Sequence, residues 1–93
     1  MITAARLARL KWRARRGARE LDSLLLTFVE EQWQNLDDVA LGALERLLEE
    51  QDPVLLDWFL QRQLPADAAI RQLIDQILKY TCRRRQGVAG VGR

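Results

Sequence analysis

The residues of this chain that could do chemistry are charged side chains gathered around a glycine, in the stretch RRGARELD from Arg15 to Asp22. Guanidinium and carboxylate groups orient another molecule through charge-assisted hydrogen bonds, and a glycine between them lets a second backbone approach closely. The sequence has no histidine and a single cysteine, Cys82, which excludes a serine–histidine or cysteine–histidine nucleophile and argues against a zinc or iron site. We therefore expect a binding protein rather than an enzyme, with no catalytic, metal-binding or cofactor-binding residues of its own.

The same motif can also be interpreted as a simple turn. Gly17 tolerates positive φ and can therefore end a helix. Glu20 in the first turn of the following helix would interact favourably with the helix dipole. Arg16 and Glu20 could also pair across the break, although an exposed pair adds little stability. From these residues alone, a turn and a partner-binding interface are about equally supported.

The elements that must position this motif are predicted to be helices. The sequence is 48% hydrophobic and has two prolines and five glycines, three of them in the last seven residues, so its interior is almost free of helix breakers. Apolar residues recur at helical spacing in five segments, beginning with residues 4–15 and 19–35. The sequence thus predicts an all-α fold, a compact bundle of about five short helices. Residues 1–80 would form a single domain and residues 81–93 a mobile basic tail.

Aspartates are predicted to mark where the last three helices begin. Asp37 or Asp38 would cap the third helix, which should end near residue 51. Asp52 would accept backbone N–H bonds at the start of a fourth helix over residues 53–62, with Pro53 where its missing N–H does no harm. Asp67 would cap the fifth helix. The fourth helix is apolar on most sides, so we expect it to be the most buried.

Charge is distributed unevenly along the chain, whose net charge is +2. Residues 1–20 carry seven basic groups and one acid, residues 21–78 three basic groups and twelve acids, and residues 79–93 five basic groups and no acid. The basic N-terminal segment could contact nucleic acid phosphates or serve as a mitochondrial presequence. It lacks interleaved aromatic residues beyond Trp12 and any obvious cleavage region, and the acidic body would repel a polyanion. We therefore expect a solvated helix face, with no nucleic acid partner and no membrane insertion.

Several stretches of the chain together resemble a known family. RRGARELD is followed by a leucine-rich helix, then by LERLLEEQDPVLLDWFL and LPAD, from about Ala8 to about Tyr80. In this order and spacing they resemble the succinate dehydrogenase assembly factors, the small bacterial flavinylation factors of the SdhE/YgfY type, which have a mitochondrial counterpart. The Arg-Gly-x-x-Glu motif is short, but together with the Asp-Pro-x-x-x-x-Trp stretch from Asp52 to Trp58 it is fairly specific. Departures in the third helix and in the linker before LPAD affect packing and loop shape more than the motif.

The resemblance implies a five-helix bundle that binds the flavoprotein subunit of succinate dehydrogenase or fumarate reductase and promotes covalent attachment of FAD to a histidine of that subunit. It places Arg16, Gly17 and Glu20 at the contact with this partner, with Arg15 and Asp22 beside them, and so favours the interface over the turn. No stably bound cofactor is implied, and we expect a positional mechanism that brings FAD and the acceptor histidine together. We expect a monomer or weak dimer in the bacterial cytoplasm rather than in the mitochondrial matrix.

Two other classes of function remain as alternatives. An antitoxin-like regulatory protein-binding module would have a cytoskeletal protein or a toxin as its partner instead of a flavoprotein. A small nucleic-acid-binding helical domain would show an affinity that falls steeply as salt rises.

Overall fold

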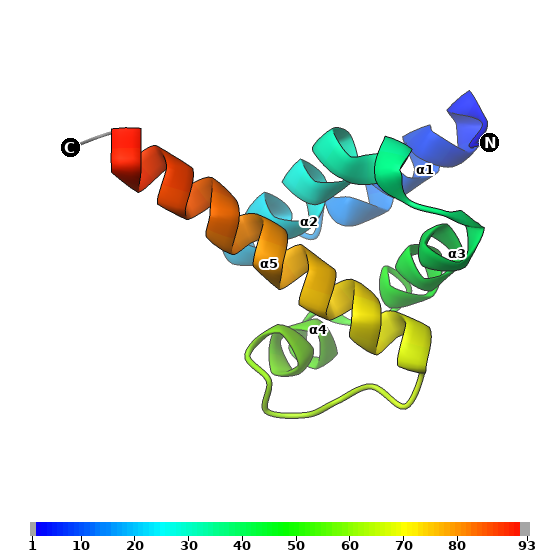
Figure 1. Cartoon of the computed structure of the whole chain (residues 1–93). Helices are drawn as coiled ribbons and strands as arrows, with labels where there is room; N and C mark the ends of the chain where they lie inside the picture. The colour runs from blue at the N-terminus through cyan, green and yellow to red at the C-terminus, as the bar shows by residue number, and fades with distance from the viewer. Residues whose placement is uncertain (1, 92–93) are drawn as a thin grey trace.

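The fold is entirely helical over the residues that the structure describes. The computed structural model describes the backbone of residues 2–91 and the side chains of residues 2–83. The elements are α1 (Ala4–Ala14), α2 (Arg19–Gln32), the 3₁₀ helix η1 (Trp33–Asn35), α3 (Asp38–Leu47), α4 (Asp52–Phe59) and α5 (Ala68–Val91) (Figure 1). The predicted all-α bundle is confirmed, and the predicted helix over residues 19–35 is present as α2 followed by η1. Across these residues, no helix combines the length and the apolar character that crossing a membrane requires.

Two helices end earlier than the sequence pattern predicts. α3 ends at Leu47 rather than near residue 51, because the chain tightens into a turn in which the amide of Glu50 donates to the carbonyl of Leu47 at 3.1 Å. α4 ends at Phe59 rather than at residue 62, and Gln61 beyond it has a φ of 61°. A residue in the left-handed region cannot continue a right-handed helix.

The aspartates predicted to begin helices behave in two different ways. Asp37 caps α3 by accepting from the backbone amide three residues on, at 2.8 Å, and Asp67 caps α5 in the same manner, at 2.9 Å from the amide two residues on. The prediction for Asp52 is wrong, because the N-cap of α4 is Gln51 and no side chain caps that helix. The Asp52 carboxylate instead accepts a hydrogen bond from Arg16.

The apolar stripes of the helices meet in one core. Its buried residues come from every α-helix and from the segments between them: Leu10, Ala14, Leu21, Leu25, Phe28, Val29, Leu36, Leu41, Ala43, Leu44, Leu47, Leu48, Leu55, Trp58, Phe59, Ile70, Leu73, Ile74 and Ile77. Within α4 only Pro53 is exposed, while Leu60, directly after the helix, is 60% exposed.

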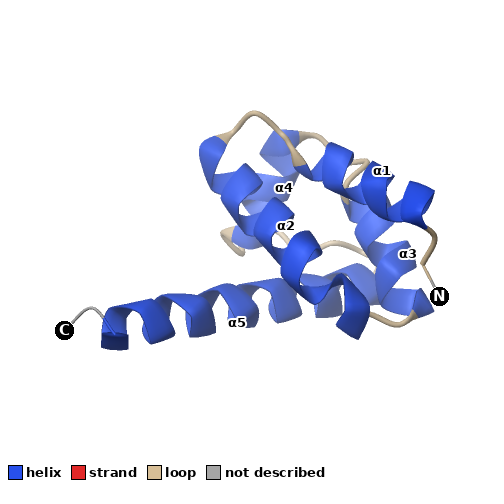
Figure 2. Cartoon of the chain, turned by 90° about the horizontal axis from the view of Figure 1, so that it is seen from above, coloured by secondary structure: helices blue, strands red, loops and turns tan. Residues whose placement is uncertain are grey.

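The long helix α5 organises the bundle. It packs against α3, α2 and α4, while α1 packs mainly on α2. Figures 1 and 2 show its C-terminal part extending past the other helices. Helix α5 continues to Val91, into the segment predicted to be a basic tail. The side chains of residues 84–91 and the whole of residues 92–93 lie outside the described part of the chain, so the mobility of that tail stays a prediction.

Candidate functional site

The glycine motif forms the corner between α1 and α2, here called the α1–α2 corner (residues 15–20). α1 ends at Ala14 and α2 begins at Arg19. Gly17 has a φ of 86°, in the left-handed region that L side chains rarely adopt, which confirms the predicted helix break. A Cβ at this position would meet no heavy atom within 4 Å. The glycine is therefore required by the backbone conformation, and the space above it is open.

Asp22 fixes the backbone of this corner from within α2. Its Oδ1 atom accepts hydrogen bonds from the amide of Gly17, at 3.1 Å, and from the amide of Arg16. The N-cap residue of α2 is Ala18, which has no side-chain acceptor to offer. Asp22, in the first turn of the helix, reaches back to amides that precede the N-cap, and no side chain caps α2 itself. The carboxylate predicted to contact a partner is used inside the fold.

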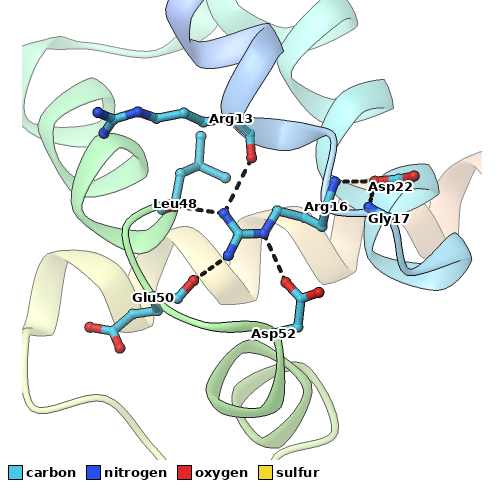
Figure 3. A network of polar contacts seen from close by, with 7 residues as sticks. All are labelled: Arg13, Arg16, Gly17, Asp22, Leu48, Glu50 and Asp52. Carbon is cyan, nitrogen blue, oxygen red and sulfur yellow. Dashed lines mark hydrogen bonds and ion pairs between the residues drawn. The ribbon is translucent and has the colours of Figure 1, made fainter.

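Arg16 connects the corner to the segment between α3 and α4. Its Nε donates to Oδ1 of Asp52 at 2.9 Å, and its Nη1 donates to the carbonyl of Leu48 at 2.7 Å. Nη2 donates to the carbonyl of Glu50, and Nη1 also reaches the carbonyl of Arg13 at 3.3 Å. Figure 3 shows the guanidinium surrounded by these acceptors, and only 15% of the side chain is exposed. The suggested pairing of Arg16 with Glu20 is wrong, since the ion pair of Arg16 goes to Asp52.

The other predicted residues face solvent. Arg15, Gly17 and Glu20 are all exposed. Trp12, three residues before the corner, is 74% exposed, which is unusual for so large an apolar side chain. The structure therefore divides the predicted site into an open part, formed by Arg15, Gly17 and Glu20, and a supporting part, formed by the Arg16 and Asp22 side chains.

A groove begins at Glu20 and runs between α2, α4 and α5. It has a volume of about 1000 Å³ and is lined mostly by apolar side chains, including Leu24, Leu56 and Leu78, with Cys82 also in its wall. Cys82 is a free, exposed thiol. Within the described part of the chain, no group of three or more histidine, cysteine, aspartate or glutamate side chains is placed to hold a metal ion. The groove lining offers apolar contact and, through Glu20, Ser23 and Thr27, hydrogen bonding.

A second ion pair fastens the other end of α1. Arg6 donates to both carboxylate oxygens of Glu45 in α3, at 2.8 Å each. This hydrogen bonding, with the charge of Arg6, holds the pKa of Glu45 below its ordinary value although burial acts in the opposite direction. Two ion pairs thus tie α1 and the corner after it to later parts of the chain, one at Glu45 and one at Asp52.

Sequence reasoning missed the partners of Arg16. Asp52 is 36 residues away from Arg16 and sits in an Asp-Pro pair that is typical of a capped helix start. The other acceptors are backbone carbonyls, which no residue type marks in a sequence. The available signal was weak: Asp52 lies in one of the stretches that carry the family resemblance, as Arg16 does.

A known family matches the part of the chain that contains both Arg16 and its partner Asp52. The model of a family described as the flavinator of succinate dehydrogenase matches residues 8–81, which include the α1–α2 corner and Asp52. The chain belongs to this family. The resemblance inferred from the sequence is thereby confirmed, and the flavinator family consists of assembly factors rather than enzymes that catalyse a reaction of their own.

Relatives within the flavinator family are similar over most of their length. The FAD assembly factor SdhE of Pseudomonas aeruginosa is 41% identical over 78 residues, which cover 84% of this chain and 93% of that protein. The protein of the same name from Pseudomonas savastanoi is 40% identical over 78 residues, with the same coverage of 84% and 93%. The one from Colwellia psychrerythraea is 42% identical over 72 residues, which cover 77% of this chain and 79% of that protein.

Proposed function

We propose that this chain is an FAD assembly factor that binds the flavoprotein subunit of succinate dehydrogenase or fumarate reductase and promotes covalent attachment of FAD to a histidine of that subunit. The observation that carries the proposal is the match of residues 8–81 to the flavinator family, with 41% identity to an FAD assembly factor over most of both chains. The relatives named above are bacterial, which supports the bacterial cytoplasm as its location.

The mechanism that fits the residues is positional. The chain contains no histidine, so it cannot itself be the acceptor of a histidyl-linked flavin. In our proposal it binds no FAD stably but holds the partner so that FAD and the acceptor histidine meet in a reactive geometry. Well-oriented groups reach effective molarities of roughly 10⁵ M or more, so positioning alone is enough to accelerate the attachment.

The contact surface in this proposal is the open part of the α1–α2 corner. Gly17 lets a backbone segment of the partner approach, because the space above it is empty. Glu20 and Arg15 orient that segment through charge-assisted hydrogen bonds. Trp12 adds a large exposed apolar side chain next to the corner, and tryptophan is enriched among residues that dominate binding energy. Arg16 belongs to the same site through its backbone and its support of the corner.

The proposal is tested by mixing the purified chain with the apo flavoprotein subunit and FAD and following covalent flavin by fluorescence in a denaturing gel. Covalent flavin should form faster with the wild-type chain than without it. Gly17→Arg and Glu20→Ala should each slow the reaction at least about ten-fold at limiting factor concentration, which corresponds to a loss of about 1.4 kcal/mol in binding.

Matched controls place the same changes at exposed positions outside the corner. Gln34→Arg adds an arginine on η1, and Glu30→Ala removes a glutamate further along α2. Both controls should retain wild-type activity. Full activity of the two corner variants would contradict the proposed site. If the wild-type chain stimulates flavinylation of neither the succinate dehydrogenase subunit nor the fumarate reductase subunit, the proposed function itself is contradicted.

A further inference from the structure

The Arg16 side chain closes a connection between two distant corners of the fold. Its backbone belongs to the α1–α2 corner, and its guanidinium lies against the segment that joins α3 to α4 (Figure 3). The carbonyls of Leu48 and Glu50 that it contacts follow the end of α3, where helix carbonyls lack intrahelical partners. Asp52, at the start of α4, supplies the negative charge.

This arrangement leaves the Arg16 side chain little freedom to contact another protein. The guanidinium is 15% exposed and already donates through Nε, Nη1 and Nη2. A direct contact would require it to leave acceptors that compensate a largely buried charge, and uncovering such acceptors is costly. Gly17 and Glu20, by contrast, are exposed, and they lie one and four residues after Arg16 in the chain.

The Asp52 carboxylate can accept from Arg16 because it caps no helix. The backbone carbonyl of Gln51 accepts hydrogen bonds from two amides in the first turn of α4, those of Val54 at 3.0 Å and Leu55 at 3.1 Å. Asp52 is also half-covered, with 33% of its side chain exposed, so its interaction with Arg16 is less screened than a fully exposed pair would be.

We propose that Asp52 is a positioning residue for partner binding: through Arg16 it holds the α1–α2 corner in the conformation that presents Gly17 and Glu20. Asp52 itself touches no partner in this proposal. The inference rests on the proposed function, in that the partner is the flavoprotein subunit. It adds a residue of α4 to a site that otherwise lies entirely in residues 12–22.

The matched comparison is between Asp52→Asn and Glu45→Gln. Each change replaces a carboxylate that pairs with an arginine of α1 or the corner, and both carboxylate side chains are 33% exposed. Asp52→Asn should raise the factor concentration needed for half-maximal flavinylation by at least about ten-fold, while the maximal rate at saturating factor stays at the wild-type value. Glu45→Gln should change neither quantity. Asp52→Glu, which keeps the carboxylate, should recover most of the lost affinity.

A measurement on the chain alone separates this proposal from the proposed function. Hydrogen exchange of the amides of Arg16 and Gly17, which donate to Asp22, should accelerate in Asp52→Asn relative to wild type, while the amides of α5 keep their protection. In Glu45→Gln the corner amides should exchange as in wild type. Unchanged corner exchange in Asp52→Asn, or an equal loss of affinity in both variants, would overturn the positioning role. A wild-type chain that fails to stimulate flavinylation, with the exchange result as expected, would instead refute the function.

Discussion

The backbone amide of Gly17 donates to Oδ1 of Asp22 at 3.1 Å, so the first turn of α2 reaches back and holds the corner that precedes it. Arg16, the neighbour of this glycine, donates from Nε to Oδ1 of Asp52 in α4 at 2.9 Å. The α1–α2 corner is thus fixed from two directions while Gly17 and Glu20 stay exposed. This division lets a short motif be both rigid and accessible to a partner.

The positive φ of Gly17 predicts how substitutions there affect folding. Because a Cβ would meet no neighbouring atom, Gly17→Ala should cost only the backbone strain of the left-handed conformation, about 1 to 2 kcal/mol in the free energy of unfolding. Gly17→Asn should cost less, since asparagine tolerates this conformation. Urea denaturation should therefore show that the free energy of unfolding falls in the order wild type, Gly17→Asn, Gly17→Ala. An alanine variant as stable as wild type would show that the corner does not need a glycine.

Asp22 is predicted to matter for stability rather than for contact with a partner. Asp22→Ala removes the acceptor for two backbone amides and a negative charge near the N-terminus of α2, which should lower the free energy of unfolding by about 1 to 2 kcal/mol. Asp22→Asn keeps one acceptor oxygen and should lose less. Ser23→Ala, a change at the exposed neighbouring position, serves as the control in the same urea titration. Equal stability of Asp22→Ala and Ser23→Ala would refute the role of Asp22 in holding the corner.

The local features of the fold could be predicted from the sequence, and the long-range contacts of the site could not. Apolar residues at helical spacing located the five α-helices, and the predicted caps Asp67 and Asp37 (left open between Asp37 and Asp38) are confirmed, because capping depends on neighbours within a few residues. Asp52 precedes a proline in the same way, yet its carboxylate turns to Arg16. Nothing in the local pattern distinguishes an aspartate that caps its own helix from one that pairs with a side chain 36 residues away.

The same limit applies to the residues predicted at the interface. The family resemblance implied a contact at Arg16, Gly17 and Glu20 with Arg15 and Asp22 beside them; the first four lie in the α1–α2 corner and Asp22 lies in α2. The sequence alone did not reveal which of these side chains point inward, because that depends on carbonyls and carboxylates supplied by other segments. Their contact with a partner stays a prediction.

Glu20 should contribute to partner binding in a way that depends on salt. It is an exposed carboxylate, so a contact with a cationic group of the partner would be screened as ionic strength rises. We expect the affinity of the wild-type chain for the apo flavoprotein subunit to fall between low and high salt more steeply than that of Glu20→Gln. Isothermal titration calorimetry at several salt concentrations gives both slopes. Glu30→Gln, on the same helix, should keep the wild-type slope, and parallel slopes for wild type and Glu20→Gln would rule out an ionic contact.

The ion pair of Glu45 predicts the acid sensitivity of the fold. The hydrogen bond and charge of Arg6 hold the pKa of Glu45 below its ordinary value of 4.5, against the opposing effect of burial. Because the folded pKa is the lower one, this stabilisation is fully present above about pH 4.5 and is lost as the pH falls through the folded value. Urea denaturation at a series of pH values should therefore show a smaller loss of stability on acidification in Glu45→Gln than in wild type.

Some loss of stability on acidification should persist in Glu45→Gln, because the pKa of Asp67 is also lowered. Burial raises the pKa of Asp67, but hydrogen bonds from the amides of Ile70 and Ala69 and from the Arg46 side chain together outweigh that effect. Identical pH profiles of wild type and variant would show that the Arg6–Glu45 pair does not stabilise the folded chain.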